Sequence, residues 1–162
     1  GNDMTFCQKF MIANGLLVVL VAMVAGFMLL FSLVGGLEIW PGKIIVMDAY
    51  GTTEGWVRAH TGGLLNGMLV LVMGQLLPSL DLSSGMRKFM AYGFVYIAWS
   101  FTIFYWVGNA TANRSLTLGD SPLGESSFTS IIGFLPGFPS VFLVIVLLIV
   151  AVKAVVVRSE IR

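Results

Sequence analysis

Four long stretches of the chain carry no charged side chain and no histidine. They lie between Lys9 and Glu38, between His60 and Asp81, between Lys88 and Arg114, and between Glu125 and Lys153. A helix needs about 20 mostly apolar residues to cross a bilayer, and each stretch is long enough. The pattern therefore predicts four membrane-spanning helices, near Phe10–Val34, Thr61–Leu80, Phe89–Gly108 and Phe128–Val157.

The predicted fold is an all-α integral membrane protein, with residues 1–162 forming a single domain. Lipid offers the backbone no hydrogen-bond partner, and no long alternating pattern indicates a β-barrel. The second connection is brief, so the helices are expected to form an antiparallel bundle. Because of Pro136 and Pro139, the sequence allows two structures for the last span. Either Pro139 begins a helix that runs to Val157 after an interfacial segment, or one kinked helix contains both prolines.

Composition supports a membrane protein and excludes several other classes. Hydrophobic residues make up 57% of the chain and charged residues 10%, whereas an ordinary soluble domain has about 25% charged residues. Mean hydropathy is +0.94. The net charge of +1, with no basic stripe, argues against a nucleic-acid partner. The single cysteine, Cys7, excludes an intrachain disulfide.

The distribution of lysine and arginine predicts the orientation. The N-terminus, second loop and C-terminus carry six of these residues: Lys9, Arg87, Lys88, Lys153, Arg158 and Arg162. The first and third loops carry Lys43, Arg58 and Arg114. Positive charge is retained on the cytoplasmic side, so both termini are predicted to lie in the cytoplasm. Trp40, Trp56, Tyr92 and Trp106 lie near span ends, where amphipathic rings commonly sit.

One histidine, His60, lies at the start of the second predicted span, and two interpretations of it remain open. It is either a hydrogen-bonded interfacial residue or a ligand of a metal or haem. Gly63 and Gly67 share its helical face, so the strip beside it has almost no side chains. Such a strip admits either a flat macrocycle or a closely packed helix. Haem would be the economical metal group, because the porphyrin supplies four ligands and needs only one from the protein.

A polar stripe on the third span lies near the same end of the bilayer as His60. Thr102, Tyr105 and Asn109 share one face, and Asn66 adds an amide on the second helix. Interhelical hydrogen bonding would account for Thr102 and Asn109 as well as a site would. Asn66 lies six residues from His60, which is about 120° round the helix. A pocket using both residues is therefore expected to lie between subunits.

Two blocks of the sequence resemble the styrene oxide isomerase family, a family of small bacterial membrane proteins with four spans. They are GGLEIWPGKII and EGWVRAHTGGLLNGM, followed by Tyr105 and the run NRSLT. The similarity runs without gaps from about Leu33 to Gly119, and elsewhere only the hydropathy agrees.

The resemblance implies a cofactor, an assembly and three site residues. It places the axial ligand of a ferric haem b on His60, and the family's active-site asparagine and tyrosine on Asn66 and Tyr105. It also implies a homotrimer with haem between subunits, in the bacterial inner membrane. Arg58 and Arg114 would then contact either the haem propionates or only the surface loops. Better-known members carry an aspartate and an asparagine where this chain has Ile97 and Phe101, so its preferred epoxide is expected to differ.

The implied reaction is a redox-neutral Meinwald rearrangement of a hydrophobic aryl epoxide to an aldehyde, as from styrene oxide to phenylacetaldehyde. Ferric iron would act as a Lewis acid on the epoxide oxygen, and Tyr105 and Asn66 would orient the substrate. An epoxide-producing monooxygenase is a plausible partner by family.

Two other functions stay open at this stage. A haem-binding electron-transfer subunit would need a second strong axial ligand, which one of nine methionines would have to supply. A four-helix transporter would usually carry an ionisable residue deep in a span, and none is present. Cys7 as a thiolate haem ligand is disfavoured, because it precedes the first span and has no basic neighbour closer than Lys9.

Overall fold

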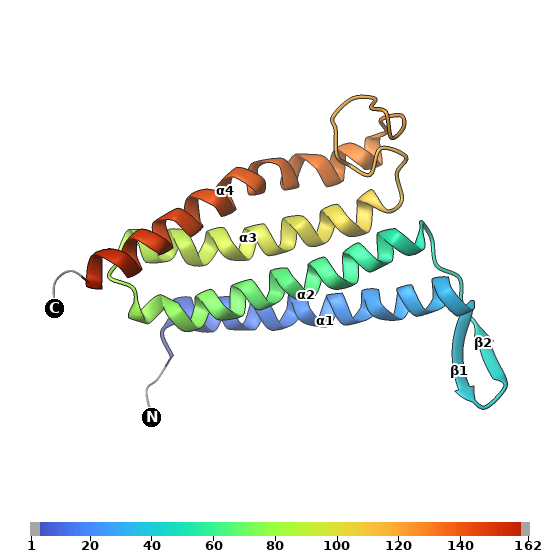
Figure 1. The fold of residues 1–162 in the computed structure, drawn as a ribbon, viewed down its shortest axis with the longest axis horizontal. Helices are drawn as coiled ribbons and strands as arrows, with labels where there is room; N and C mark the ends of the chain where they lie inside the picture. Colours follow the sequence, from blue (N-terminus) through green and yellow to red (C-terminus); the bar gives the residue numbers. More distant parts are fainter. Residues whose placement is uncertain (1–3, 160–162) are drawn as a thin grey trace.

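A computed structural model describes residues 4–159 of the chain. Its elements in order are α1 (Phe6–Val34), β1 (Gly36–Trp40), β2 (Lys43–Val46), α2 (Thr53–Leu76), the 3₁₀ turn η1 (Leu77–Ser79), α3 (Ser84–Gly108) and α4 (Phe128–Ser159) (Figure 1). Four helices are long and apolar enough to cross a membrane, as predicted. Arg162, one of the six cations used to predict the orientation, lies outside the described residues.

The first three long helices each begin before the predicted span, because helix ends and charge boundaries are set by different forces. Thr5, Thr52 and Ser83 act as N-caps, each accepting a backbone N–H from the first turn. Such caps satisfy donors that have no partner inside the helix. Charges mark the boundary of the lipid, whereas caps mark the end of the helix, so α2 starts at Thr53 and includes Arg58 and His60.

The last span is one helix with Pro136 and Pro139 inside it, so the kinked-helix alternative is the one observed. The orange beginning and the red end of α4 run in different directions in Figure 1. Two side-chain hydroxyls, one from α3 and one from α4 itself, donate hydrogen bonds to the α4 backbone at Pro136. The Tyr96 hydroxyl donates to the Pro136 carbonyl at 2.8 Å, and the Ser140 hydroxyl donates to the same oxygen at 3.2 Å. The bond from Tyr96 joins α3 to α4 beside the prolines.

The first connection contains a β-hairpin that the sequence analysis did not predict. Strand β1 pairs antiparallel with β2, and Trp40 faces Lys43 across the turn. Gly42 adopts a positive φ of 80°, which suits glycine in the third position of a type II turn after Pro41. The pair Pro41-Gly42, between two apolar runs, was the feature of the sequence that indicated this turn. In Figure 1 the hairpin projects away from the helices.

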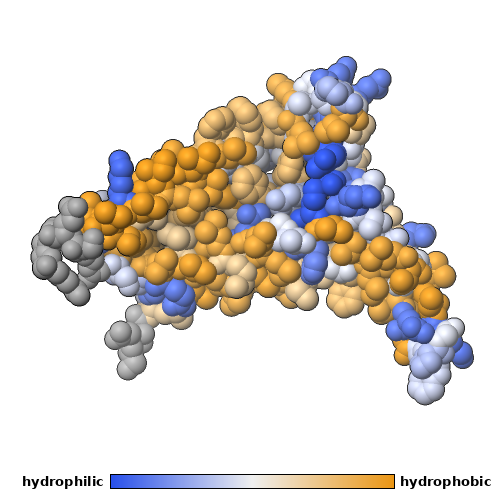
Figure 2. Space-filling view, in the orientation of Figure 1, coloured by the Kyte–Doolittle hydropathy of each residue, from blue (hydrophilic) through white to orange (hydrophobic). Residues whose placement is uncertain are grey.

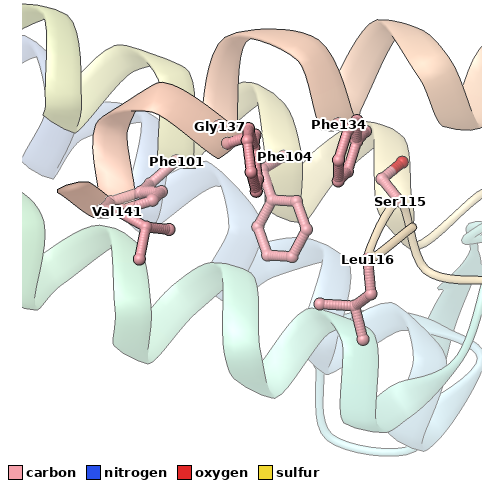
Figure 3. Close-up of a pocket in the computed structure, with 8 residues that line it drawn as sticks. Phe101, Phe104, Ser115, Leu116, Phe134, Gly137 and Val141 are labelled. Atoms are coloured by element: carbon pink, nitrogen blue, oxygen red, sulfur yellow. The ribbon is translucent and has the colours of Figure 1, made fainter. Parts of the chain in front are cut away.

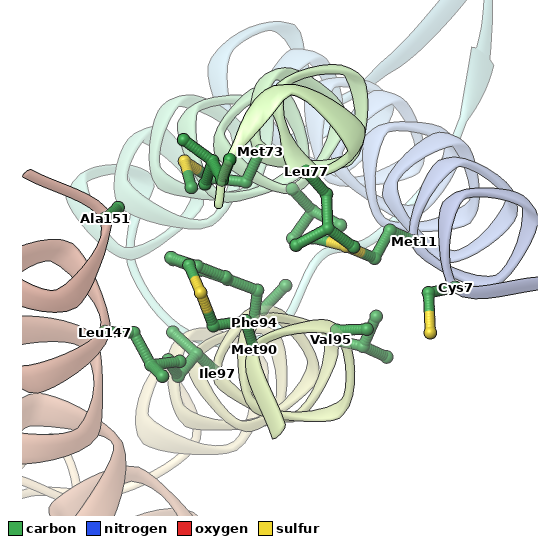
Figure 4. Close-up of a cluster of buried hydrophobic side chains, with 14 of the residues drawn as sticks. Cys7, Met11, Met73, Leu77, Met90, Phe94, Val95, Ile97, Leu147 and Ala151 are labelled. Atoms are coloured by element: carbon green, nitrogen blue, oxygen red, sulfur yellow. The ribbon is translucent and has the colours of Figure 1, made fainter. Parts of the chain in front are cut away.

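The helices associate chiefly as two pairs, α1 with α2 and α3 with α4, and α2 and α3 join the pairs. The beginning of α1, the α2–α3 connection and the end of α4 lie at one end of the molecule, opposite the hairpin and the 109–127 segment (Figure 1). The central core draws side chains from all four helices (Figure 4). Its members include Cys7, Met11, Met73, Met90, Phe94, Ile97 and Leu147.

The outer surface is mainly hydrophobic over the helices, and hydrophilic residues gather towards the end that carries the hairpin and the 109–127 segment (Figure 2). In its most apolar window, 50% of the residues of α3 are buried within the chain, against 17% in α1 and α4. Since α1 and α4 expose long apolar faces that water would not stabilise, a multi-pass membrane protein is the class that this surface fits.

Candidate functional site

His60 projects from α2 towards α1, where it is held by one backbone group. Its Nδ1 atom lies 2.8 Å from the carbonyl oxygen of Ala22. A carbonyl accepts only, so Nδ1 carries the hydrogen and Nε2 keeps its lone pair. A Cβ atom at Gly26 would lie 2.8 Å from Nδ1, so this glycine leaves the space that the imidazole occupies. No described residue provides a hydrogen bond to Nε2.

This arrangement is one that a metal-ligating histidine requires. Such residues almost always donate the other ring N–H to a carbonyl or carboxylate, which fixes the tautomer and the ring orientation. No group of three or more His, Cys, Asp or Glu side chains lies together among residues 4–159. The donor set therefore fits a group that brings most of its own ligands, and haem is such a group.

Gly63 and Gly67 also face α1, and α1 fills the space beside them. A Cβ atom at Gly63 would lie 2.8 Å from the Cβ of Ala22, and one at Gly67 would lie 2.6 Å from Val19 Cγ2. Small residues at this spacing let two membrane helices approach closely. Of the two interpretations of the glycine strip, this geometry supports close helix packing. Gly63 and Gly67 therefore contact α1 and leave no space there for a macrocycle.

Tyr105 and Asn66 meet on the other side of α2, as the stripe on the third span suggested. The side chain of Asn66 lies close to the Tyr105 hydroxyl. The ring lies against Gly62, where a Cβ atom would come within 2.6 Å of ring carbons. Sequence reasoning missed Gly62. The pair Gly62-Gly63 was the feature of the sequence that indicated it, since adjacent residues of a helix lie on different faces.

The two halves of the predicted site therefore lie on different faces of α2. His60 faces α1 through Ala22, whereas Asn66 faces α3 through Tyr105. This separation is what the 120° between positions 60 and 66 predicts. Within one chain the imidazole and the phenol therefore have different neighbouring helices.

Arg58 and Arg114 lie near each other at the same end of the bundle. Each is close enough for its charge to be felt by the other, and Arg58 is also close to Glu54 and Tyr105. Arg114 adopts a positive φ of 58°, and its buried Nε has no hydrogen-bond partner. Glu54 is the acidic neighbour of Arg58, on the same helix. Two adjacent cations of this kind suit an anionic group such as a carboxylate.

Asn109 joins the end of α3 to the beginning of α2. Its Oδ1 accepts from the Thr52 backbone N–H at 2.9 Å and from the Thr52 hydroxyl at 3.3 Å. The predicted interhelical role of Asn109 is confirmed, whereas Thr102 donates to the carbonyl of Ala98 within its own helix. Asn109 therefore sets where the helix that carries His60 begins.

An aromatic cluster beneath the first connection was also missed. Trp56 is fully buried, and its ring lies 4.9 Å from those of Tyr50 and Trp106. Trp56 is therefore buried within the protein, and its Nε1 donates to the backbone carbonyl of Tyr50 at 2.8 Å. Trp40 and Tyr92 are exposed, as expected of rings at a membrane boundary.

Comparison with known proteins identifies the family of this chain. A model of the family described as styrene oxide isomerase matches residues 7–156. The curated styrene-oxide isomerase of Pseudomonas fluorescens is 33% identical over 131 residues, which cover 81% of this chain and 78% of that protein. A four-helix membrane fold, one oriented histidine and a match over most of the sequence agree, and the chain belongs to the styrene oxide isomerase family of enzymes.

Proposed function

We propose that this protein isomerises a hydrophobic aryl epoxide of the styrene oxide type to the corresponding aldehyde. The reaction breaks the benzylic C–O bond, moves a hydride from the neighbouring carbon to the benzylic carbon, and forms the carbonyl. Substrate and product have the same atoms, so no oxidant or reductant is consumed. The observation that carries the proposal is His60, whose Nδ1 is fixed by Ala22 and whose Nε2 is left for a cofactor.

The cofactor that fits these residues is ferric haem b. His60 would hold its iron, and Arg58 and Arg114 would hold its propionates, which would give the buried Nε of Arg114 the acceptor that it lacks among the described residues. When bound there, the haem supplies a Lewis acid that withdraws electron density from the epoxide oxygen.

Residues of the chain would orient the substrate and exclude water. Tyr105 would donate a hydrogen bond to the substrate oxygen, and Asn66, whose side chain lies near the phenol, would help to hold it in position. Gly62 gives the ring of Tyr105 its place against α2. Apolar surroundings within the membrane keep water from the benzylic cation, which water would otherwise convert to a diol.

The separation of the two half-sites favours an assembly in which they meet between copies of the chain. His60 of one protomer would face Tyr105 and Asn66 of its neighbour, and a homotrimer closes such a head-to-tail contact. Each protomer would be an antiparallel bundle in the inner membrane with both termini in the cytoplasm, as the distribution of lysine and arginine indicates.

The test combines a spectrum with a product assay. Protein purified in detergent after haem-supplemented expression should show a Soret band that shifts when an unreactive epoxide analogue is added. It should convert styrene oxide to phenylacetaldehyde, as followed by gas chromatography. His60→Ala should lose both the band and the product. A protein that forms aldehyde without a Soret band would overturn the haem assignment, and one that forms no aldehyde would overturn the reaction.

A further inference from the structure

A cavity of about 120 Å³ lies between α3, α4 and the segment that connects them. Four phenylalanines line it, Phe101 and Phe104 from α3 and Phe134 and Phe138 from α4 (Figure 3). Phe138 is 52% exposed and forms the rim, so the cavity opens on the lateral surface of the helices. That surface belongs to helices that are apolar enough to cross a membrane.

The inner end of this cavity contains a strained serine. Ser115 is the one side chain with a polar group among the lining residues, and it is 1% exposed. Its φ is 55°, an unusual value for a residue other than glycine. Its Oγ has no hydrogen-bond partner among residues 4–159 and lies 2.5 Å from the position that a Cβ atom on Gly133 would take. Strained and unsatisfied groups of this kind occur most often at functional sites.

The size and lining of the cavity define the ligand that it suits. An apolar cavity of about 150 Å³ is known to bind benzene, so 120 Å³ is of the right order for one ring, given the open side. Surrounding phenylalanines favour an aromatic guest through edge-to-face and offset contacts. Rotation about the Cα–Cβ bond of Ser115 would turn its hydroxyl from Gly133 towards the guest, where it would donate to one oxygen.

We propose that this cavity is a binding site for a small aromatic molecule that carries a single oxygen acceptor. With the proposed function, on which the identity of the molecule rests, the guest is the aryl epoxide arriving from the bilayer or the aldehyde leaving. The ring of Phe104 lies 5.4 Å from that of Tyr105, so the cavity adjoins the residue that orients the substrate. An acyl chain is too long for a one-ring cavity.

Binding can be measured with probes that do not isomerise. We would follow 4-fluoroacetophenone by ¹⁹F NMR with the protein in nanodiscs, and compare it with 4-fluoroethylbenzene, which lacks the oxygen. Ser115→Ala should weaken binding of the ketone about fivefold, the equivalent of one ordinary hydrogen bond, and leave the hydrocarbon unchanged. Equal affinities of both probes for both proteins would overturn the role of Ser115.

A glycine variant tests the cavity itself. A Cβ atom at Gly137 would meet Phe104 side-chain atoms at 3.6 Å or more, an ordinary contact, so Gly137→Ala should fold and take up space that the ring needs. One methyl group in a hydrophobic pocket changes affinity about tenfold. The matched control is Gly85→Ala, on α3, where a Cβ atom would meet nothing within 4 Å. Unchanged binding in Gly137→Ala would overturn the proposal, as would displacement of the probe by hexadecane as readily as by styrene.

His60→Ala separates this inference from the proposed function. That variant should bind 4-fluoroacetophenone like the wild type, because the imidazole faces α1 rather than this cavity. If the wild type binds the probe but makes no aldehyde, the reaction is wrong and the aromatic site stands. If it makes aldehyde but Gly137→Ala alters neither probe binding nor KM, the reaction stands and the cavity proposal is wrong.

Discussion

Nδ1 of the His60 imidazole and the backbone carbonyl oxygen of Ala22 are 2.8 Å apart, across the interface between α2 and α1. The bond fixes the histidine tautomer from a helix that carries no other group of the proposed site. It depends on Gly26, because any side chain there would meet the ring. The orientation of the proposed haem ligand is thus decided by the packing of α1 on α2.

Gly26→Ala should therefore impair haem binding without touching the ligand itself. The new Cβ would displace the ring from the Ala22 carbonyl, and loss of such an orienting bond typically lowers metal affinity roughly 10- to 100-fold. The measurement is haem content per chain by the pyridine haemochrome assay, with Gly85→Ala as control. Full haem occupancy in Gly26→Ala would show that the Ala22 contact is dispensable.

Tyr105→Phe should separate catalysis from cofactor binding. The ring can still lie against Gly62, so the fold and the haem content should be retained. Loss of one positioned donor to a developing oxyanion typically costs about 100-fold in kcat. Asn66→Ala should lower kcat by less, because it frees the phenol without removing it. The readout is kcat and KM for styrene oxide at matched haem content, and wild-type turnover in both variants would remove both residues from the mechanism.

Asn109 should prove to be a residue that positions α2. Its Oδ1 accepts two bonds from Thr52, and it is 8% exposed. Asn109→Ala removes the acceptor of the Thr52 N–H, so we expect a loss of about 0.5–1.5 kcal/mol in the free energy of unfolding.

Asn109→Asp provides the control for this position. It keeps the acceptor beside the start of a helix, where a negative charge is favourable, and should recover most of the stability. Thermal unfolding in detergent, followed by circular dichroism, compares the three proteins. Equal melting temperatures for Asn109→Ala and the wild type would argue against the role.

Tyr50 should contribute a dependence of stability on pH in the alkaline range. Burial raises the pKa of the Tyr50 hydroxyl above its ordinary value, and this hydroxyl donates to the Trp106 carbonyl at 2.7 Å. The folded state therefore favours the protonated phenol. The resulting stability is complete below a pH of about 10, the ordinary pKa of tyrosine, and is lost as pH rises through the folded-state value.

The difference in melting temperature between the wild type and Tyr50→Phe isolates this group. It should be constant at neutral pH and shrink as the pH is raised above about 10. A difference that grows in that range would contradict the direction of the shift.

The sequence by itself determined the class of fold and the inventory of the site. Hydropathy and helix capping are local properties, so four charge-free stretches were enough to predict four spans, and Thr52 and Ser83 could have corrected their beginnings. His60 is the one histidine of the chain, and it lies in a block that carries the family resemblance. The sequence was therefore enough to identify it as the candidate ligand. The Pro-Gly turn of the hairpin was equally local and was simply overlooked.

The tertiary structure alone decided which residues face one another. A membrane helix such as α1 is apolar all round, so its sequence does not say which side meets a neighbour. Helix rotation and crossing turn Gly63 and Gly67 towards α1 and Gly62 towards Tyr105, although the three lie within six positions of the chain. The same packing brings Asn109 to Thr52 and encloses the cavity between α3 and α4. These relationships depend on contacts between distant segments, which no local pattern encodes.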